Sequence, residues 1–126
     1  MPINIRADGD VTVLSNFGAL LNDPRHFDAS RDVRAVLDEG CRNFALDLGG
    51  LRDLGSAGLG LLTTITRLIR RYDGDAVLIN LRPTAMAFLD EMRMDVYWEV
   101  FKDIAEAKAF FDGESESPFE EEGLSG

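Results

Sequence analysis

The sequence predicts an α/β fold in which a mixed β-sheet is packed with about four helices. Three observations predict it: two short alternating runs flank Asp8-Gly9, two later apolar runs lie on either side of an amphipathic stretch, and turn residues separate these segments. A hairpin followed by strand–helix alternation implies an antiparallel start and then parallel strands joined by right-handed crossovers. The expected order is β-β-α-β-α-β-α-β-α. It leaves open whether the helices cover one face of the sheet or both.

The first predicted elements are a hairpin and a helix. Apolar and polar residues alternate over 3–7 and 11–13, and Asp-Gly suits the positive φ values of a tight two-residue turn. Residues 14–24 are expected to continue as strand and then as loop. A helix follows, with Ser30 as its N-cap and Gly40 as its end. Its apolar face is formed by Val33, Val36 and Leu37.

The middle of the chain predicts two buried strands with a long helix between them. Residues 44–48 and 76–81 are short, mostly apolar runs, as expected of strands covered on both faces. Between them, apolar residues recur at helical spacing on one side, and polar residues occupy the other. The apolar side is Leu61, Leu62, Ile65, Leu68, Ile69 and Tyr72; the polar side is Thr63, Thr64, Thr66, Arg67, Arg70 and Arg71. Residues 73–75 end this helix.

The last predicted elements are two helices with a short strand between them. Pro83 suits the first turn of a helix that is expected to bury Met86, Leu89 and Met92 or their neighbours. Residues 97–101 are an aromatic-rich strand, and Asp103 and Glu106 have the spacing of a capping box that opens a helix reaching Phe111. Residues 1–112 are therefore predicted to form one domain, and residues 113–126 a disordered acidic tail.

Composition restricts the function classes. The net charge is −10, with 13 Lys and Arg against 23 Asp and Glu, which argues against a nucleic-acid surface. Five of the acids lie in the tail, at positions 114, 116, 120, 121 and 122. Without a secretory signal or an apolar run of bilayer length, the sequence predicts a cytoplasmic protein with no membrane insertion. Cys41 is alone, which excludes an internal disulfide, and it is expected to be a small, partly buried hydrophobe.

The most informative stretch is the Gly-rich turn Leu54–Gly60, where a buried strand gives way to the long helix. It places the hydroxyl of Ser56 at the start of the helix, among glycines that keep the surrounding surface low. Another protein could reach this hydroxyl, and the partly positive N–H groups of a helix N-terminus tolerate an added phosphate. The alternative is that Ser56 is an ordinary N-cap and the glycines only turn the chain.

No enzymatic motif fits this turn. The glycine spacing G-x-x-G-x-G is the reverse of part of a dinucleotide fingerprint, there is no lysine for a phosphate loop, and Leu54 takes the first glycine position of a nucleophile elbow. His26 is the only histidine and is expected in a solvated loop. Asp47 and Asp53 flank the turn and could form a carboxylate pair, but nothing else builds a substrate site around them. The sequence predicts no catalytic residue, metal or cofactor.

The segment from Leu51 to Leu62, Leu-Arg-Asp-Leu-Gly-Ser-Ala-Gly-Leu-Gly-Leu-Leu, together with the preceding Leu46-Asp47-Leu48, resembles the STAS domain of bacterial anti-sigma-factor antagonists. The resemblance extends over roughly residues 3–112, with the same element order. Family members usually carry Asp-Ser-Ser/Ala-Gly-Leu-Gly, and this chain has Gly55 where that aspartate would be.

The resemblance implies a regulatory binding protein and not an enzyme. It aligns Ser56 with the family's phosphorylated residue. It implies that the unphosphorylated chain binds an ATP-binding serine-kinase anti-sigma factor and releases it once phosphorylated. Whether a phosphatase then resets the serine is left open by the sequence. The partner-binding residues implied are Asp53, Gly55, Ser56, Ala57, Gly58, Leu59 and Gly60. In binding, a phosphate facing a partner's acid at about 6 Å costs roughly 5 kcal/mol.

Two other functions remain open at this stage. STAS-like domains also serve as scaffolds in stressosome assemblies or as accessory subunits of membrane transport complexes, where they pack against an ATPase subunit. A small-molecule or nucleotide binder could use the glycine turn for phosphate. Arg67, Arg70 and Arg71 could meet an acidic partner, although a solvated helix face is the simpler interpretation.

Overall fold

The computed structural model describes residues 3–22 and 28–113. Five strands form one sheet in the order in which they occur in the chain: β1 (Asn4–Asp8), β2 (Val11–Ser15), β3 (Asn43–Asp47), β4 (Asp75–Ile79) and β5 (Val100–Phe101). β1 pairs antiparallel with β2, and every later pair is parallel. This confirms the predicted mixed sheet. The two turn residues between β1 and β2 are Gly9 and Asp10, one position later than predicted, because Asp8 still pairs with Val11.

Within the described ranges, five helices accompany the sheet, where the sequence predicted about four: α1 (Phe17–Leu21), α2 (Ala29–Asp38), α3 (Gly55–Arg71), α4 (Pro83–Glu91) and α5 (Ile104–Phe111). The additional helix is α1, which lies in the segment expected to be strand and loop. The predicted continuation of the strand beyond residue 14 extends only to Ser15, where β2 ends. The remainder of the expected loop (23–27), His26 included, and residues 114–126 of the predicted tail lie outside the described residues.

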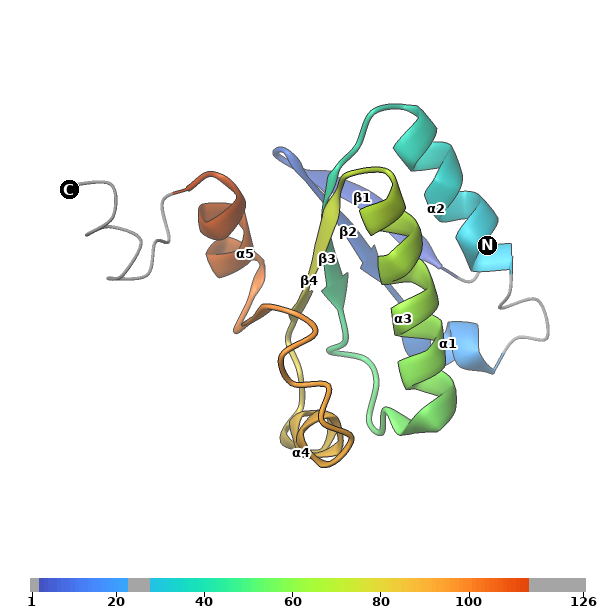
Figure 1. The fold of residues 1–126 in the computed structure, drawn as a ribbon, viewed down its shortest axis with the longest axis vertical. Coiled ribbons are helices and arrows are strands. Elements are labelled where there is room, and N and C mark those ends of the chain that lie inside the picture. Colours follow the sequence, from blue (N-terminus) through green and yellow to red (C-terminus); the bar gives the residue numbers. More distant parts are fainter. Residues whose placement is uncertain (1–2, 23–27, 114–126) are drawn as a thin grey trace.

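The helices are divided between the two faces of the sheet, a point that the sequence left open. α1, α2 and α3 cover one face, α5 covers the other, and α4 lies beyond the carboxyl end of β4 (Figure 1). Strand side chains alternate accordingly: Phe44 and Leu46 belong to the cluster under α2 and α3, whereas Ala45 packs with Ala107 of α5. β3 and β4 are buried on both faces, as predicted.

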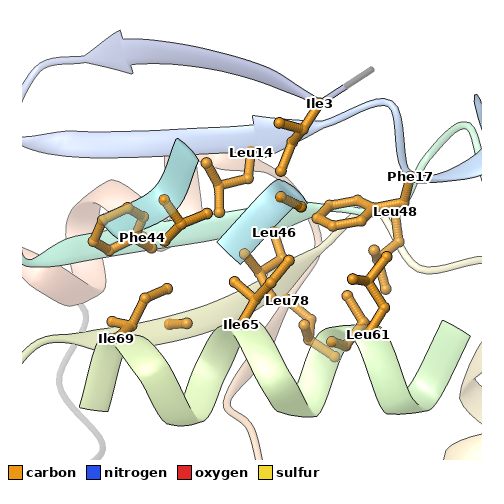
Figure 2. Close-up of a cluster of buried hydrophobic side chains, with 14 of the residues drawn as sticks. Ile3, Leu14, Phe17, Phe44, Leu46, Leu48, Leu61, Ile65, Ile69 and Leu78 are labelled. Carbon is orange, nitrogen blue, oxygen red and sulfur yellow. The ribbon is translucent and has the colours of Figure 1, made fainter. Parts of the chain in front are cut away.

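The larger cluster holds the fold together. In Figure 2, Leu61, Ile65 and Ile69 of α3 point toward the strand side chains of the sheet. These three residues are spaced four apart, so that one face of α3 meets the sheet from Leu61 to Ile69. The predicted apolar side of the helix is confirmed, with five members buried and Tyr72 half-buried.

Two of the helix ends follow the expected chemistry, the end of α2 and the start of α5. Gly40, at φ 104°, ends α2 as predicted, and the N–H groups of Gly40 and Cys41 donate to the carbonyls of Leu37 and Val36. Asp103 caps α5 by accepting from the N–H of Glu106 at 3.0 Å. The Glu106 carboxylate accepts in return from the N–H of Lys102, at 2.9 Å.

One prediction about helix positions was wrong, and another held only in part. The N-cap of α2 is Asp28, so Ser30 lies within the first turn. α4 buries Ala85 and Leu89, while Met92 is 46% exposed and Met86 half-buried. The helix begins at Pro83 as expected, but its packing face is rotated toward the smaller side chain. None of the helices among the described residues is long and apolar enough to cross a membrane.

Candidate functional site

The Gly-rich turn lies where the carboxyl ends of the parallel strands meet. β2, β3 and β4 run side by side, and the segments that follow them are α1, the 48–54 loop and the entry to α4. Figure 1 shows the start of α3 near α1 and α4 at this end of the sheet. In open α/β sheets, binding sites are typically found outside the carboxyl ends of the strands.

The carboxylate of Asp47 fixes the beginning of the 48–54 loop. Its Oδ1 accepts a hydrogen bond from the N–H of Gly49 at 2.9 Å and another from Nδ2 of Asn80 at 3.0 Å. Asn80 follows β4 with φ 58°, a left-handed conformation that asparagine tolerates better than most residues. The sequence suggested a carboxylate pair of Asp47 and Asp53. Asp47 instead serves to tie the two loops together.

The entry to α4 holds the same loop at two further points. Oγ1 of Thr84 donates to the carbonyl of Arg52 at 2.9 Å, and Nε of Arg82 donates to the carbonyl of Gly49 at 3.2 Å. Both contacts join residues more than thirty positions apart, so sequence reasoning did not identify them. The only local signal is an Asn-x-Arg-Pro-Thr segment that follows a buried strand.

Ser56 is exposed, and its hydroxyl has no hydrogen-bond partner among the described residues. α3 begins at Gly55, the N-cap position is Leu54, and no side chain caps this end. Ser56 is the second residue of the helix, so the interpretation of Ser56 as an ordinary N-cap is wrong. At the N-terminal end of a helix, the first N–H groups lack intrahelical acceptors and carry partial positive charge. An anion on Ser56 would lie beside them.

Gly55 explains how the chain turns into α3. Its φ is +67°, and an added Cβ would meet nothing within 4 Å. The restriction at this position is therefore conformational and not steric. Glycine adopts positive φ without strain, and aspartate is among the few other residues that adopt it with some frequency. The replacement of the aspartate usual in the resembling family by Gly55 is thus compatible with the same backbone.

The other predicted partner-binding residues divide into surface and packing positions. Asp53, Ala57 and Gly60 are exposed, and Leu59 is half-buried. Gly58 is buried: a Cβ there would lie 2.9 Å from Cδ1 of Leu54. Gly58 therefore permits close packing beneath the turn and offers little surface to a partner, which corrects its place in the predicted set.

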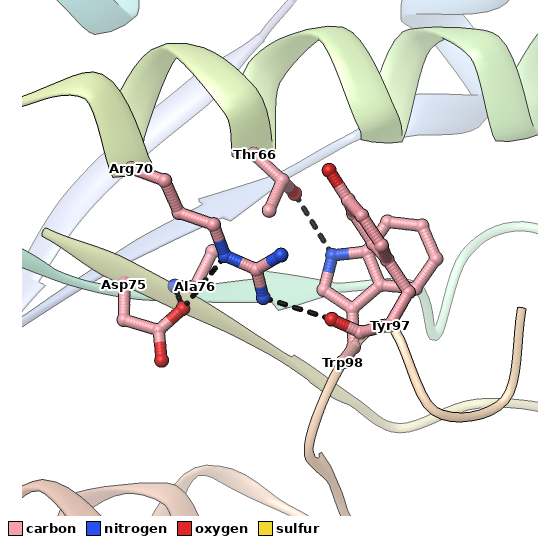
Figure 3. Close-up of polar contacts among 6 residues, drawn as sticks. All are labelled: Thr66, Arg70, Asp75, Ala76, Tyr97 and Trp98. Atoms are coloured by element: carbon pink, nitrogen blue, oxygen red, sulfur yellow. Dashed lines mark hydrogen bonds and ion pairs between the residues drawn. The ribbon is translucent and has the colours of Figure 1, made fainter.

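The polar side of α3 differs from the prediction at two positions. Thr66 is fully buried and accepts a hydrogen bond from Nε1 of Trp98 at 2.8 Å (Figure 3). Arg70 donates through Nη2 to the carbonyl of Tyr97 at 2.8 Å, pairs with Asp75 at 3.1 Å, and lies over the Tyr97 ring. Both residues hold the α4–β5 connection against α3. Arg70 is therefore not a free surface charge.

The described residues contain no group of three His, Cys, Asp or Glu side chains that could hold a metal ion. One open hollow of about 420 Å³ lies at the amino end of β3, opposite the Gly-rich turn. It is lined by residues that include Gly9, Asp10, Arg42 and Asn43. Cys41 also lines it and is half-buried against the main core, as the sequence predicted.

Comparison with known proteins gives consistent results. The STAS domain family model matches residues 3–107. Over 52 residues the chain is 36% identical to "Putative anti-sigma factor antagonist BtrV" of Bordetella bronchiseptica; the match covers 41% of this chain and 45% of the relative, less than half of its length.

Two solved structures share the fold. The NMR structure of the protein TM1081 has a TM-score of 0.69 at 21% identity, covering 82% of this chain and 83% of that one. A 1.59 Å crystal structure, of "a putative anti-sigma factor antagonist (tm1081)" from Thermotoga maritima, has a TM-score of 0.63 at 19% identity. The match covers 84% of this chain and 91% of that one. At these identities, the likeness establishes the fold alone.

Proposed function

This chain belongs to the STAS domain family, and on that premise we propose that it is an anti-sigma factor antagonist with Ser56 as its phosphorylated switch. In the proposed cycle, the unphosphorylated chain binds a serine-kinase anti-sigma factor, and phosphorylation by that kinase releases it. The observation that carries the proposal is the exposed Ser56 hydroxyl, which makes no hydrogen bond among the described residues and caps no helix. Among the described residues, no contact that holds the fold together involves this hydroxyl.

The proposed switch requires that the fold tolerate the phosphate. Phosphoserine adds about −1.5 to −2 charges at neutral pH. Near the N-terminus of a 17-residue helix, this charge meets the positive end of the helix dipole, an interaction of about 0.3–1 kcal/mol in favour of the folded state. Because Ser56 is exposed, the phosphate also stays hydrated. Phosphorylation should therefore leave the fold intact.

The proposed switch also requires that the phosphate disrupt the complex. Asp53, Ala57 and Gly60 lie at the surface around Ser56, so that a partner covering this surface brings its own atoms against the serine. A charge of −2 about 6 Å from one partner carboxylate costs roughly 5 kcal/mol at an effective dielectric constant near 20. Since each 1.4 kcal/mol is tenfold, affinity falls by about three decades.

The test begins with capture from a lysate of the source organism on the immobilised wild-type chain, with and without ATP. The captured kinase is identified by mass spectrometry, produced in pure form, and used in all later measurements. We expect ³²P transfer to the wild-type chain and none to Ser56→Ala. Ser30→Ala, which removes a half-buried hydroxyl from α2, outside the surface around Ser56, should be phosphorylated normally. Incorporation into Ser56→Ala contradicts the assignment of the site.

Binding is then compared between Ser56→Asp and Ala105→Asp. Ala105 is exposed and is the second residue of α5, so the second variant places the same charge in the equivalent helical position on the other face of the sheet. Ser56→Asp should weaken the complex at least tenfold, and Ala105→Asp should not. Equal affinities, or capture of an ATP-binding-cassette subunit in place of a serine kinase, would overturn the proposed function.

A further inference from the structure

A single line of exposed residues continues from Ser56 along the whole of α3. The residues that form this line, called here the α3 stripe, are Ser56, Gly60, Thr64, Arg67 and Arg71, and all five are exposed. At 100° per residue they lie within about 80° of one another around the helix axis. A partner that lies along α3 and covers Ser56 therefore faces the other four.

The far end of the α3 stripe carries two unpaired positive charges. In the part of the chain that the structure describes, neither Arg67 nor Arg71 makes an ion pair or a hydrogen bond through its guanidinium. The neighbouring Arg70, by contrast, is fully engaged with Asp75 and Tyr97. Among the residues that the structure describes, the two arginines are unpaired, although the full chain has ten more acidic than basic residues.

The helix gains little from this arrangement. Arg67 and Arg71 are four positions apart, a spacing at which like charges repel each other weakly on a helix. Arg71 lies in the last turn, where a positive charge interacts favourably with the helix dipole, but Arg67 lies before that turn. Between Ser56 and these charges the stripe consists of Gly60 and Thr64, whose side chains are small and uncharged. The hydroxyl of Thr64 donates back to the carbonyl of Gly60, at 2.8 Å.

The dimensions fit one interface. With a rise of 1.5 Å per residue, Arg67 lies about 16 Å and Arg71 about 22 Å along the axis from Ser56. A standard interface covers about 800 Å² on each partner, which corresponds to a patch roughly 30 Å across. A partner centred between Ser56 and Thr64 therefore covers the serine and reaches the arginines at its rim.

We infer that the partner of this surface carries an acidic patch that meets Arg67 and Arg71, and that these two arginines steer its association along the α3 stripe. The inference rests on the proposed function, since it describes the same partner. The charge complementarity follows from the two arginines being the charged side chains of the stripe that holds the serine, without an ion-pair partner among the described residues. Charges at the rim of an interface mainly accelerate association and make it salt-dependent, with less effect on dissociation.

The test measures association rates with the purified kinase by stopped-flow at 25 mM and 500 mM NaCl. Arg67→Glu changes the charge by two units about 8 Å from a partner carboxylate, which slows association about fivefold at low salt. The effect should shrink toward zero at high salt because the Debye length falls to a few ångströms. Lys102→Glu is the matched control: Lys102 is exposed, precedes α5, and gives the same net charge.

Equal rates for Arg67→Glu and Lys102→Glu at low salt overturn the inference. If Ser56→Asp still weakens the complex in that case, the proposed function stands and only the steering role fails. A second probe needs no kinase: a decaglutamate peptide is titrated into the labelled chain and followed by NMR. The Nε–H signals of Arg67 and Arg71 should shift at least twice as far as that of the exposed Arg34 of α2. Equal shifts contradict the inference.

Discussion

The variant Gly60→Ala tests whether the glycine at this exposed position of α3 is needed for binding a partner or for the stability of the fold. Gly60 lies inside the helix, is exposed, and does not have positive φ. A Cβ added there would meet nothing within 4 Å. An alanine should therefore fit without strain. Because glycine in a helix interior loses more backbone entropy on folding, Gly60→Ala should stabilise the chain by about 0.4–1 kcal/mol.

For a chain of this size, that gain corresponds to a melting temperature about 2–4 °C higher. The matched control is Gly74→Ala. A Cβ at Gly74 would lie 2.6 Å from the carbonyl oxygen of Arg42 and 3.0 Å from Cγ2 of Ile69, so this variant should lose about 1–3 kcal/mol. Thermal and urea denaturation followed by circular dichroism measure both.

Gly60→Ala should also bind the kinase about tenfold more weakly, because the added methyl group separates the α3 surface from the kinase surface that covers it. Gly74→Ala, measured at a temperature where it is folded, should bind normally. A melting temperature that falls in Gly60→Ala would refute the conclusion that the fold does not need this glycine. An unchanged affinity would refute the conclusion that a partner covers it.

Three further predictions concern the contacts that hold the site and its surroundings. Thr66→Val leaves the Nε1–H of Trp98 buried without an acceptor, so urea denaturation should show a loss of about 1–3 kcal/mol, whereas Thr66→Ser, which keeps the hydroxyl, should lose less. Asp47→Ala should accelerate hydrogen exchange at the N–H of Gly49, because this N–H loses its acceptor. Asp47→Asn retains an oxygen acceptor and should preserve part of the protection. Unchanged exchange in both variants would show that the carboxylate does not hold the loop. The hydrogen bond from Lys108 lowers the pKa of Asp8 below its usual value of 3.8, so the stability that this pair contributes is present above pH 3.8 and is lost as the pH falls through the lowered pKa. The difference in melting temperature between the wild-type chain and Lys108→Met should therefore become smaller as the pH is lowered through this range. A difference that stays constant would contradict the assignment.

The sequence was sufficient to predict the elements whose signals are local and strong. β3 and β4 were recognisable because Phe44–Leu46 and Ala76–Ile79 are apolar without interruption. α3 was recognisable because its apolar residues keep one helical face for about three turns. The hairpin and the caps at Gly40 and Asp103 also follow from short motifs. These features depend on neighbours within a few positions.

The features that the sequence did not predict depend on tertiary contacts. α1 has only five residues and begins after Asn16 at φ 74°, so its length and its start gave no helix signal. The packing face of α4 is set by what lies beneath it, which the spacing of Met86 and Met92 did not show. At the site, Ser56 and its exposed neighbours could be identified, but the contacts of Asn80, Arg82 and Thr84 join distant segments and need coordinates.

The contacts beneath Ser56 have a consequence for protein engineering. The loop that leads to the serine is held by Asp47 from one strand end and by Asn80, Arg82 and Thr84 from the next. A graft that transplants only residues 54–60 onto another scaffold therefore leaves these anchors behind. To reproduce the presentation of the serine, a chimera has to carry both segments, 47–60 and 80–84. It also has to place them after two neighbouring parallel strands paired in the register of β3 and β4.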